Sequence, residues 1–218
     1  MLYLCNPCGA PSSPAALRIV EAMRSGPLGF IDTPGQRQAR PGDVEWCADN
    51  GCFSKGFPGE AAWYAWLTRQ AQQRDRSLCR FAVAPDVVGD AAATWERSAP
   101  WLPKIRELGL PAAFVAQNGL DVDTLDWSAF DVLFIGGDDE FKLGPAGREA
   151  IAAARAREIP VHMGRVNSYK RLAYAKSLGV SSCDGTFLRF HPTLNLDRVH
   201  EWFAKLDSVP GPDERLEL

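Results

Sequence analysis

Residues 132–138 read Val-Leu-Phe-Ile-Gly-Gly-Asp, a short apolar run that ends in two glycines and a carboxylate. An apolar run of this length before a glycine turn is typical of a buried strand in a parallel sheet. The same arrangement recurs at residues 113–119, Ala-Phe-Val-Ala-Gln-Asn-Gly, where polar residues again follow the apolar ones. Strands that end in polar groups favour an α/β fold whose functional site lies at the carboxyl ends of the strands.

Similar apolar runs alternate with helical patterns along the whole chain. We expect strands at residues 2–4, 28–31, 44–47, 81–84, 113–116, 132–135, 161–164 and 182–185. We expect helices at residues 13–24, 60–74, 91–108, 147–158, 168–178 and 196–206. This order predicts a compact (β/α)8 barrel as one domain over residues 1–208, with a flexible tail over residues 209–218. A doubly wound open sheet is the alternative, because 218 residues are few for a barrel of typically ~250.

Composition excludes several classes of protein. With 46% hydrophobic residues and a net charge of -3, the chain is neither disordered nor fibrous. No apolar run approaches the ~20 residues that cross a bilayer, and no signal sequence is recognisable, so we expect a cytoplasmic protein without a membrane partner. The six cysteines include one CxxC, Cys5 to Cys8, but no second pair completes a zinc ligand set. We therefore expect no metal.

Six predicted strands end in a polar or glycine group. These groups lie at residues 48–51, 85–86, 117–119, 136–138, 163–165 and 183–185. In a barrel all of them would meet at one face, with a loop over residues 33–43 nearby. Three of the aspartates at strand ends are candidates for chemistry: Asp49, Asp86 and Asp184. Each alone is explained by a turn or helix cap, but two carboxylates in one pocket can divide the work of nucleophile and proton donor.

The same strand ends carry groups suited to a flat heterocycle. Phe53 and Met163 offer a ring face and a polarizable thioether between which a purine could lie. Gln117 offers an amide, and the pair Gly136 and Gly137 exposes backbone without side chains. Ordinary core packing of Phe53 and Met163, and a tight turn at the glycines, are the alternatives.

Five segments, taken in order, resemble motifs of the tRNA-guanine transglycosylase superfamily. Residues 49–53 resemble its DSGGF/Y segment, residues 115–119 its VQGG segment and residues 135–137 its GGLAVGE segment. Residues 161–164 are similar to its LMGVG segment, and residues 182–185 fall where that family carries the nucleophile within MFDC. The family fold is a (β/α)8 barrel, in agreement with the strand pattern.

The resemblance implies a role for each matching residue. Asp184 would be the nucleophile that displaces guanine and bonds to the sugar, and Asp49 would be the acid/base that handles the protons of the base. The resemblance also implies a base-binding set: Asp86 and Gln117 at the edge of the heterocycle, the amides of Gly136 and Gly137 at its carbonyl oxygen, and Phe53 and Met163 on its two faces.

The sequence departs from the family in three places. Cys52 replaces the second glycine of DSGGF, and the glycine pair is followed by Asp138, Asp139 and Glu140 instead of the family's LAVGE. The family's zinc motif, CxCxxC with a later His, is absent, because no cysteine follows Cys183. This compact form resembles the relatives that insert 7-deazaguanines such as preQ0 into DNA. The resemblance therefore implies exchange of guanine in DNA for a 7-deazaguanine, without a cofactor.

Two alternatives stay open at this point. The first is the same base exchange on tRNA, and the second is a barrel that binds the base or the nucleic acid without catalysis. The oligomeric state is also open, a homo-oligomer included.

Charge is distributed unevenly along the chain. Residues 148–189 contain eight Lys/Arg against three Asp/Glu, whereas residues 104–147 contain three against eight. The basic segment includes two of the strand ends described above. We expect phosphate contacts from this segment, at Arg165, Lys170, Arg171 and Arg189. A solvated basic helix face is the ordinary alternative.

Overall fold

Eight parallel strands close into a barrel in the computed structural model, which describes residues 1–36, 40–53 and 56–212. The strands are β1 (Leu2–Cys5), β2 (Leu28–Asp32), β3 (Trp46–Ala48), β4 (Cys79–Val83), β5 (Ala112–Ala116), β6 (Val132–Ile135), β7 (Val161–Met163) and β8 (Ser182–Asp184). Each strand pairs with its neighbour in the sequence, and β8 pairs with β1 through Leu4 and Asp184. The predicted (β/α)8 barrel is confirmed, and the open sheet is excluded.

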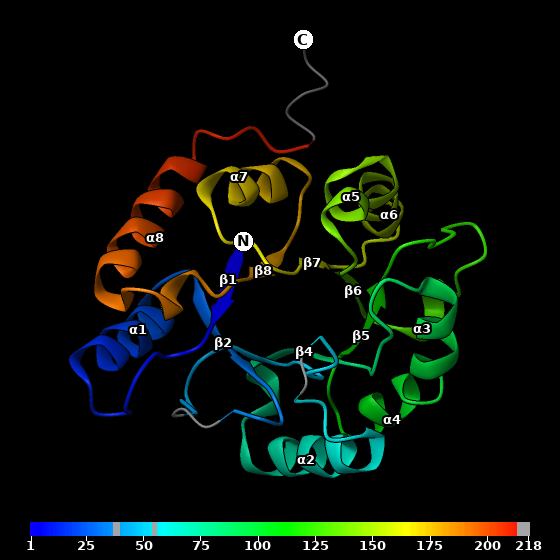
Figure 1. The fold of residues 1–218 in the computed structure, drawn as a ribbon, viewed down its shortest axis with the longest axis horizontal. Helices are drawn as coiled ribbons and strands as arrows, with labels where there is room; N and C mark the ends of the chain where they lie inside the picture. The colour runs from blue at the N-terminus through cyan, green and yellow to red at the C-terminus, as the bar shows by residue number, and fades with distance from the viewer. Residues whose placement is uncertain (37–39, 54–55, 213–218) are drawn as a thin grey trace.

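Helices form a ring outside the strands (Figure 1). They are α1 (Pro14–Ser25), α2 (Glu60–Gln73), α3 (Ala91–Ser98), α4 (Leu102–Glu107), α5 (Asp139–Leu143), α6 (Pro145–Arg155), α7 (Tyr169–Ser177) and α8 (Pro192–Leu206). Within the described residues, three 3-10 turns lie in the connections: η1 (Arg76–Leu78) before β4, η2 (Trp127–Ala129) before β6 and η3 (Phe187–Arg189) before α8. In the described part of the chain, no helix connects β2 to β3, where the sequence predicts a loop.

One predicted helix is divided in the structure, and one observed helix was not predicted. The helix expected at residues 91–108 is two helices, α3 and α4, separated at Pro100. Proline lacks the backbone N–H that a helix interior needs and disfavours helical geometry at the preceding residue, so the break is expected from its chemistry. The short helix α5 is not among the predicted elements. Its first turn is capped by Asp138, whose Oδ1 accepts from the backbone N of Phe141 at 2.8 Å. The predicted tail lies partly outside the described residues.

Apolar side chains fill two layers. Side chains that alternate along the strands point inward and form an inner cluster that includes Leu4, Cys47, Phe81, Val115 and Phe134. The intervening residues point outward and pack against the helices in a larger cluster. Side chains alternate between the two faces of a strand, so the residue two places after an inward-facing one also faces inward. The type of that residue determines which chemical group lies at the mouth of the barrel.

Candidate active site

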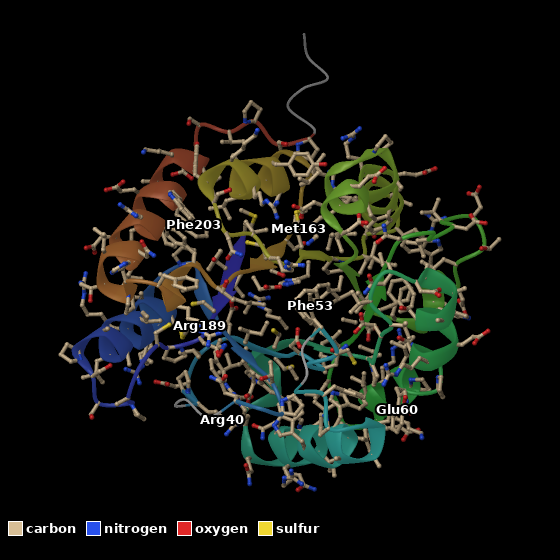
Figure 2. The ribbon with its side chains drawn as sticks, viewed as in Figure 1. Arg40, Phe53, Glu60, Met163, Arg189 and Phe203 are labelled. Atoms are coloured by element: carbon tan, nitrogen blue, oxygen red, sulfur yellow. The ribbon has the colours of Figure 1, made fainter. Side chains whose placement is uncertain are left out.

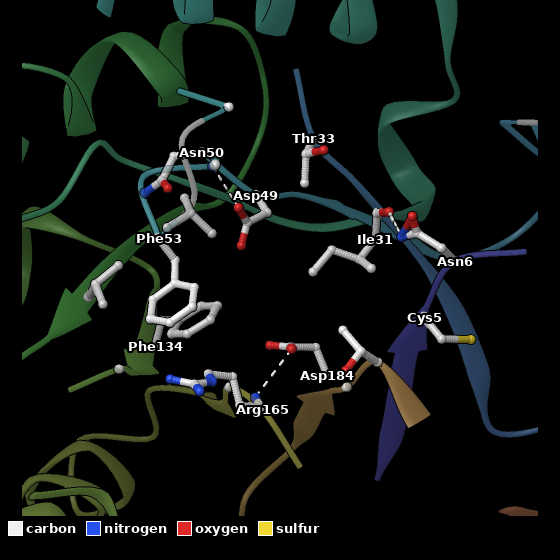
Figure 3. A pocket seen from close by; sticks show the side chains of 18 of the residues that line it. Cys5, Asn6, Ile31, Thr33, Asp49, Asn50, Phe53, Phe134, Arg165 and Asp184 are labelled. Atoms are coloured by element: carbon white, nitrogen blue, oxygen red, sulfur yellow. Dashed lines mark hydrogen bonds between the residues drawn. The ribbon is translucent and has the colours of Figure 1, made fainter. Parts of the chain in front are cut away.

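A cavity of about 730 Å³ opens at the carboxyl ends of the strands. Most of the residues predicted to form the site line it: Asp49, Phe53, Asp86, Gln117, Gly136, Gly137, Arg165, Asp184 and Arg189. The described part of the loop after β2 contributes Thr33, Gly35 and Gln36, while residues 37–39 of that predicted loop lie outside the description. Figure 3 shows the carboxylates of Asp49 and Asp184 entering the cavity from opposite sides. The strand-end prediction therefore located the cavity.

Asp184 stands at the end of β8 with its carboxylate held on both oxygens. Its Oδ2 lies 3.0 Å from Nε2 of His162, and its Oδ1 accepts from the backbone N of Arg165 at 3.2 Å. Arg165 presents this N–H from a left-handed backbone, φ 64°, which costs energy in a residue with a side chain. A Cβ at Gly185 would collide with the Tyr3 hydroxyl oxygen, so only glycine fits after the carboxylate. These contacts orient Asp184 while leaving its side chain 16% exposed to the cavity.

His162 is a site residue that the sequence analysis did not single out. It lies fully buried inside the barrel, with its ring 4.8 Å from that of Phe81 and 4.5 Å from that of Phe134. Its Nδ1 is 2.8 Å from Oγ of Ser182, so Ser182 and Asp184 contact the two ring nitrogens. The signal for His162 was its position in β7. It is paired with Ser182 of β8, and both side chains face inward, whereas the apolar residues beside them in the sequence face outward.

Asp49 follows β3, two residues after the inward Cys47, and so faces the cavity. Desolvation raises the pKa of Asp49 to about 7, and the nearby charges of Asp184 and Asp86 act in the same direction. The backbone N of Gly51 donates to Oδ1 at 2.6 Å and opposes part of this rise. A carboxyl group with such a pKa can give or take a proton near neutral pH.

Asp86 and Gln117 form one hydrogen-bonded unit. Nε2 of Gln117 donates to Oδ2 of Asp86 at 2.6 Å, and Nδ2 of Asn50 donates to Oδ1 at 2.8 Å. Burial raises the pKa of Asp86, while the two amide donors hold it down. Oε1 of Gln117 accepts from the backbone N of Gly89 at 2.9 Å and of Gly137 at 2.8 Å. One N–H of Gln117 and the remaining lone pairs of Asp86 stay available.

The glycine pair does not offer free amides, which corrects the role predicted for it. The backbone N of Gly136 donates to the carbonyl O of Ala116 at 3.0 Å, and that of Gly137 donates to Gln117. The glycines are required for space instead. A Cβ at Gly136 would lie 2.6 Å from Cγ1 of Val115, and one at Gly137 would lie 2.7 Å from Cδ1 of Phe141. The pair therefore shapes the wall of the cavity and leaves neither backbone N–H free for a base carbonyl.

Met163 does not line the cavity, so the prediction that it stacks on a base is wrong. Its side chain is fully buried in the outer cluster between strands and helices (Figure 2). The reason is strand alternation: His162 points inward on β7, and its neighbour Met163 must point outward. The aromatic group that lines the cavity from the adjacent strand is Phe134.

Phe53 lies at the rim of the cavity, on the loop after β3. Its side chain is exposed, and the guanidinium of Arg165 lies 4.4 Å from the centre of its ring. An exposed ring next to a guanidinium offers a flat platform on which a base can stack. This placement agrees with the predicted position of Phe53 over the pocket, although the stacking itself stays a prediction.

The predicted phosphate contacts divide into two groups. Arg165 and Arg189 are exposed and line the cavity. Arg171 forms an ion pair with Asp139, NH2 to Oδ2 at 2.5 Å, and Lys170 is exposed on α7 outside the cavity wall. The structure thus brings two of the four basic residues to the cavity itself.

Lys142 is a second site residue that sequence reasoning missed. It belongs to α5, lines the cavity and is only 2% exposed. Burial lowers its pKa, with Arg165 acting in the same direction and Asp184 opposing it. Because a five-residue helix has little periodicity, the sequence carried no signal that this lysine would turn inward.

The described residues contain neither a group of metal ligands nor a helix that could span a membrane. Among residues 1–36, 40–53 and 56–212, no three His, Cys, Asp or Glu side chains are grouped so that they could hold a metal ion. The six cysteines are free thiols. In the same ranges, none of the helices combines the length and the apolar character needed to span a bilayer.

Comparison with known proteins gives likeness of structure without likeness of sequence. No protein-family model matches the chain, and no curated protein matches it. The similar solved structures include a PaMucR phosphodiesterase in complex with c-di-GMP, with 15% identity and a TM-score of 0.43 over 67% of this chain and 61% of that one. The Bacillus subtilis YkuI protein, with an EAL domain, shows 14% identity and a TM-score of 0.44 over 78% and 47% of the two chains.

A third structure is a mandelate racemase/muconate lactonizing enzyme-like protein from Rubrobacter xylanophilus, with 13% identity and a TM-score of 0.48 over 87% of this chain and 58% of that one. This chain therefore spans between 47% and 61% of the length of the three. At such identities and scores the likenesses carry no argument about activity.

Proposed function

We propose that this protein is a transglycosylase that exchanges guanine in DNA for a 7-deazaguanine through a covalent bond to Asp184. The observation that carries the proposal is the meeting, in one cavity, of Asp184, of Asp49 with its raised pKa, and of the paired Asp86 and Gln117. Asp184 and Asp49 suit bond exchange at a sugar carbon, and Asp86 with Gln117 suits hydrogen bonding to the edge of guanine. The ordered motifs of the sequence support the same assignment.

The hydrogen-bonding pattern of Asp86 and Gln117 fits guanine. The edge of guanine presents two donors, N1–H and the exocyclic amine, beside one acceptor, O6. Asp86 still offers carboxylate lone pairs, and Gln117 still offers one N–H, side by side across their 2.6 Å hydrogen bond. Adenine, which presents a donor where guanine has O6, would leave buried polar groups unpaired. The unit therefore selects guanine or a deaza analogue with the same edge.

The first half of the reaction would use Asp184 and Asp49 together. A carboxylate oxygen of Asp184 attacks C1′ of the nucleotide, and the bond from C1′ to N9 of guanine breaks. Asp49, protonated near neutral pH because burial raises its pKa, gives its proton to the departing base. The products are a glycosyl ester on Asp184, neutral guanine and an ionised Asp49.

The second half reverses these roles with a different base. The 7-deazaguanine loses its N9 proton to Asp49 as N9 attacks C1′, and the ester bond to Asp184 breaks. Two displacements at one carbon retain its configuration. The ester conserves the energy of the glycosidic bond, so the exchange consumes no cofactor. A barrel that only binds a base would not need both carboxylates.

The polynucleotide would be held at the rim. Arg165 and Arg189 are exposed beside the cavity, where phosphates on either side of the reacting nucleotide can reach them. A duplex must flip its target nucleotide into the pocket, at a cost of a few kcal/mol, and Phe53 can stack on the flipped base. We favour DNA over tRNA because the sequence lacks the zinc motif of the tRNA enzymes.

The deciding experiment measures loss of radiolabelled guanine from DNA and from tRNA with the same purified protein. We expect washout from DNA when guanine or preQ0 is supplied, and a protein–DNA adduct that survives denaturation. Turnover on tRNA alone would replace DNA with the alternative substrate. Binding of either polymer without washout, by folded protein, would leave only the non-catalytic alternative.

A further inference from the structure

The cavity contains a cation that the proposed chemistry does not use. Lys142 extends from α5 into the cavity wall and is 2% exposed as a residue. Long cationic side chains are almost never buried to this degree without a partner. The ammonium of Lys142 therefore needs an explanation of its own.

Lys142 has no acceptor among the described residues. No hydrogen bond or ion pair reaches its Nζ within residues 1–36, 40–53 and 56–212, yet Nζ is not among the fully enclosed polar atoms. The nearby carboxylates already have partners: Asp139 forms an ion pair with Arg171, and Asp184 contacts His162 and the backbone N of Arg165. A buried ammonium without an acceptor is unfavourable, so a bound ligand that supplies one is stabilised.

The start of α5 lies beside Gln117, the residue proposed to recognise the base. The helix directly follows Gly137, whose backbone N donates to Gln117, and the backbone N of Asp138 donates to Oδ1 of Asn118 at 3.1 Å. The start of α5 is thus fastened to the strand end that carries Gln117. Arg165 and Arg189, the residues proposed to contact phosphates, are exposed to solvent, whereas Lys142 is buried.

We propose that Lys142 reads the substituent on the incoming 7-deazaguanine and selects one that is a hydrogen-bond acceptor or an anion. A nitrile, amide or carboxylate at position 7 would accept from the ammonium. An aminomethyl group, itself a cation, would be repelled by Lys142 and would leave it unpaired. This inference rests on the proposed function, because it takes the cavity to be the site of the deazaguanine.

Calorimetric titration of free bases tests the inference without the reaction. Four ligands are compared: guanine, 7-cyano-7-deazaguanine, 7-carboxy-7-deazaguanine and 7-aminomethyl-7-deazaguanine. We expect the natural protein to bind the cyano and carboxy compounds about 10- to 100-fold more tightly than the aminomethyl compound, the range of a hydrogen bond to a charged group. Lys142→Met should bring the three substituted bases close together. Lys142→Glu should place the aminomethyl compound above the carboxy compound.

The matched control is Lys205→Met on α8, an exposed lysine outside the cavity, which should keep the ranking of the natural protein. Because each comparison is a ratio of dissociation constants within one variant, a partly unfolded preparation does not change it. An unchanged ranking in both Lys142 variants, or a preference of the natural protein for the aminomethyl compound, overturns the inference while guanine binding keeps the proposed function. If the folded natural protein binds none of the four bases, the proposed function itself fails.

Discussion

Nε2 of His162 lies 3.0 Å from Oδ2 of Asp184, and the other ring nitrogen lies 2.8 Å from the hydroxyl of Ser182. All three side chains point into the barrel from β7 and β8, and the histidine is completely buried. In the neutral tautomer that satisfies both contacts, Ser182 donates to Nδ1 and Nε2–H donates to Asp184. The histidine then fixes the direction in which the carboxylate faces the cavity.

This geometry predicts that His162 is a positioning residue for the proposed reaction. His162→Leu removes the donor to Asp184, and we expect kcat for base exchange to fall about 10- to 100-fold, the range seen for groups that orient a reacting ligand. KM for DNA should change little, because His162 does not reach the rim. His162→Gln can still donate to the carboxylate and should recover part of kcat. Equal losses in both variants, with a rise in KM, would point to a purely structural role.

Asp184→Ala should abolish both washout of guanine and the covalent adduct, because no other carboxylate at that strand end can attack C1′. The fold should survive, since the side chain borders a cavity and contributes little apolar contact. Adduct trapping in a denaturing gel and circular dichroism, run on the same preparation, separate the two effects. Substantial exchange by folded Asp184→Ala protein would remove the nucleophile from the mechanism.

The pKa of Asp49, raised to about 7, predicts a pH dependence for the first half-reaction. Release of guanine needs the protonated acid, so single-turnover adduct formation should slow as pH rises above about 7, with the loss following one ionisation. Asp49→Asn should slow adduct formation about 10²- to 10⁴-fold at every pH, because the amide cannot give up a proton. A natural protein whose adduct forms equally fast at pH 6 and pH 9 would contradict this role.

The same ionisation predicts a pH-dependent difference in stability. An unfolded aspartate has a pKa of about 3.9, so between about pH 4 and pH 7 the folded protein binds a proton that the unfolded chain does not, and stability falls as pH rises through this window. Above it both states are ionised, and the penalty is complete. Asp49→Asn should therefore raise Tm more at pH 8 than at pH 5, by a few degrees, since 1 kcal/mol shifts Tm by about 2–4 °C at this size.

Mutation of Phe53 should weaken base binding, whereas mutation of Met163 should not. Met163→Leu keeps the volume of an outer-layer side chain, so exchange should stay near the natural rate and the free energy of unfolding should change by less than about 1.5 kcal/mol. Phe53→Ala removes the exposed ring at the rim and should weaken base or nucleotide binding by about 1–3 kcal/mol without destabilising the fold. Steady-state kinetics together with thermal melts would distinguish these outcomes from the reverse pattern.

The placement of the basic residues predicts which of them sets the salt dependence of DNA binding. Arg165→Gln and Arg189→Gln should each lower the slope of log K against log salt by about 0.9, whatever the DNA sequence. Lys170→Gln tests the residue that lies outside the cavity wall and should leave the slope nearly unchanged. Fluorescence anisotropy between 50 and 200 mM salt measures all three. Identical slopes for every variant would place the DNA elsewhere on the surface.

The barrel was predictable from the sequence because its signals are local. A strand end such as Gln117 to Gly119 can be recognised because polar residues follow an apolar run. The strand ends lie together because the sheet is closed. Helix ends were less certain, as the break at Pro100 shows: the helical pattern continues through it, and only the chemistry of proline ends the helix.

Residue type at the strand ends predicted which positions line the cavity, but it did not predict the direction of every side chain. Met163 matches a motif letter but points outward, because its neighbour His162 points inward. The amides of Gly136 and Gly137 have partners that lie on another strand, Ala116 and Gln117. Hydrogen bonds between residues that are far apart in the sequence cannot be recognised from a short segment of it. They follow from register, which the sequence does not state.

Gln117 is a poor first choice for mutations that aim to change the proposed base specificity. Its oxygen accepts from the backbone N of Gly89 and Gly137, and its nitrogen donates to Asp86, so a substitution would loosen the contacts among the loops after β4, β5 and β6 as well as alter the proposed recognition. Polar groups without such structural contacts, like the ammonium of Lys142, can be substituted one at a time. The residues around Gln117 should therefore be kept unchanged in directed evolution, whereas Lys142 can be varied.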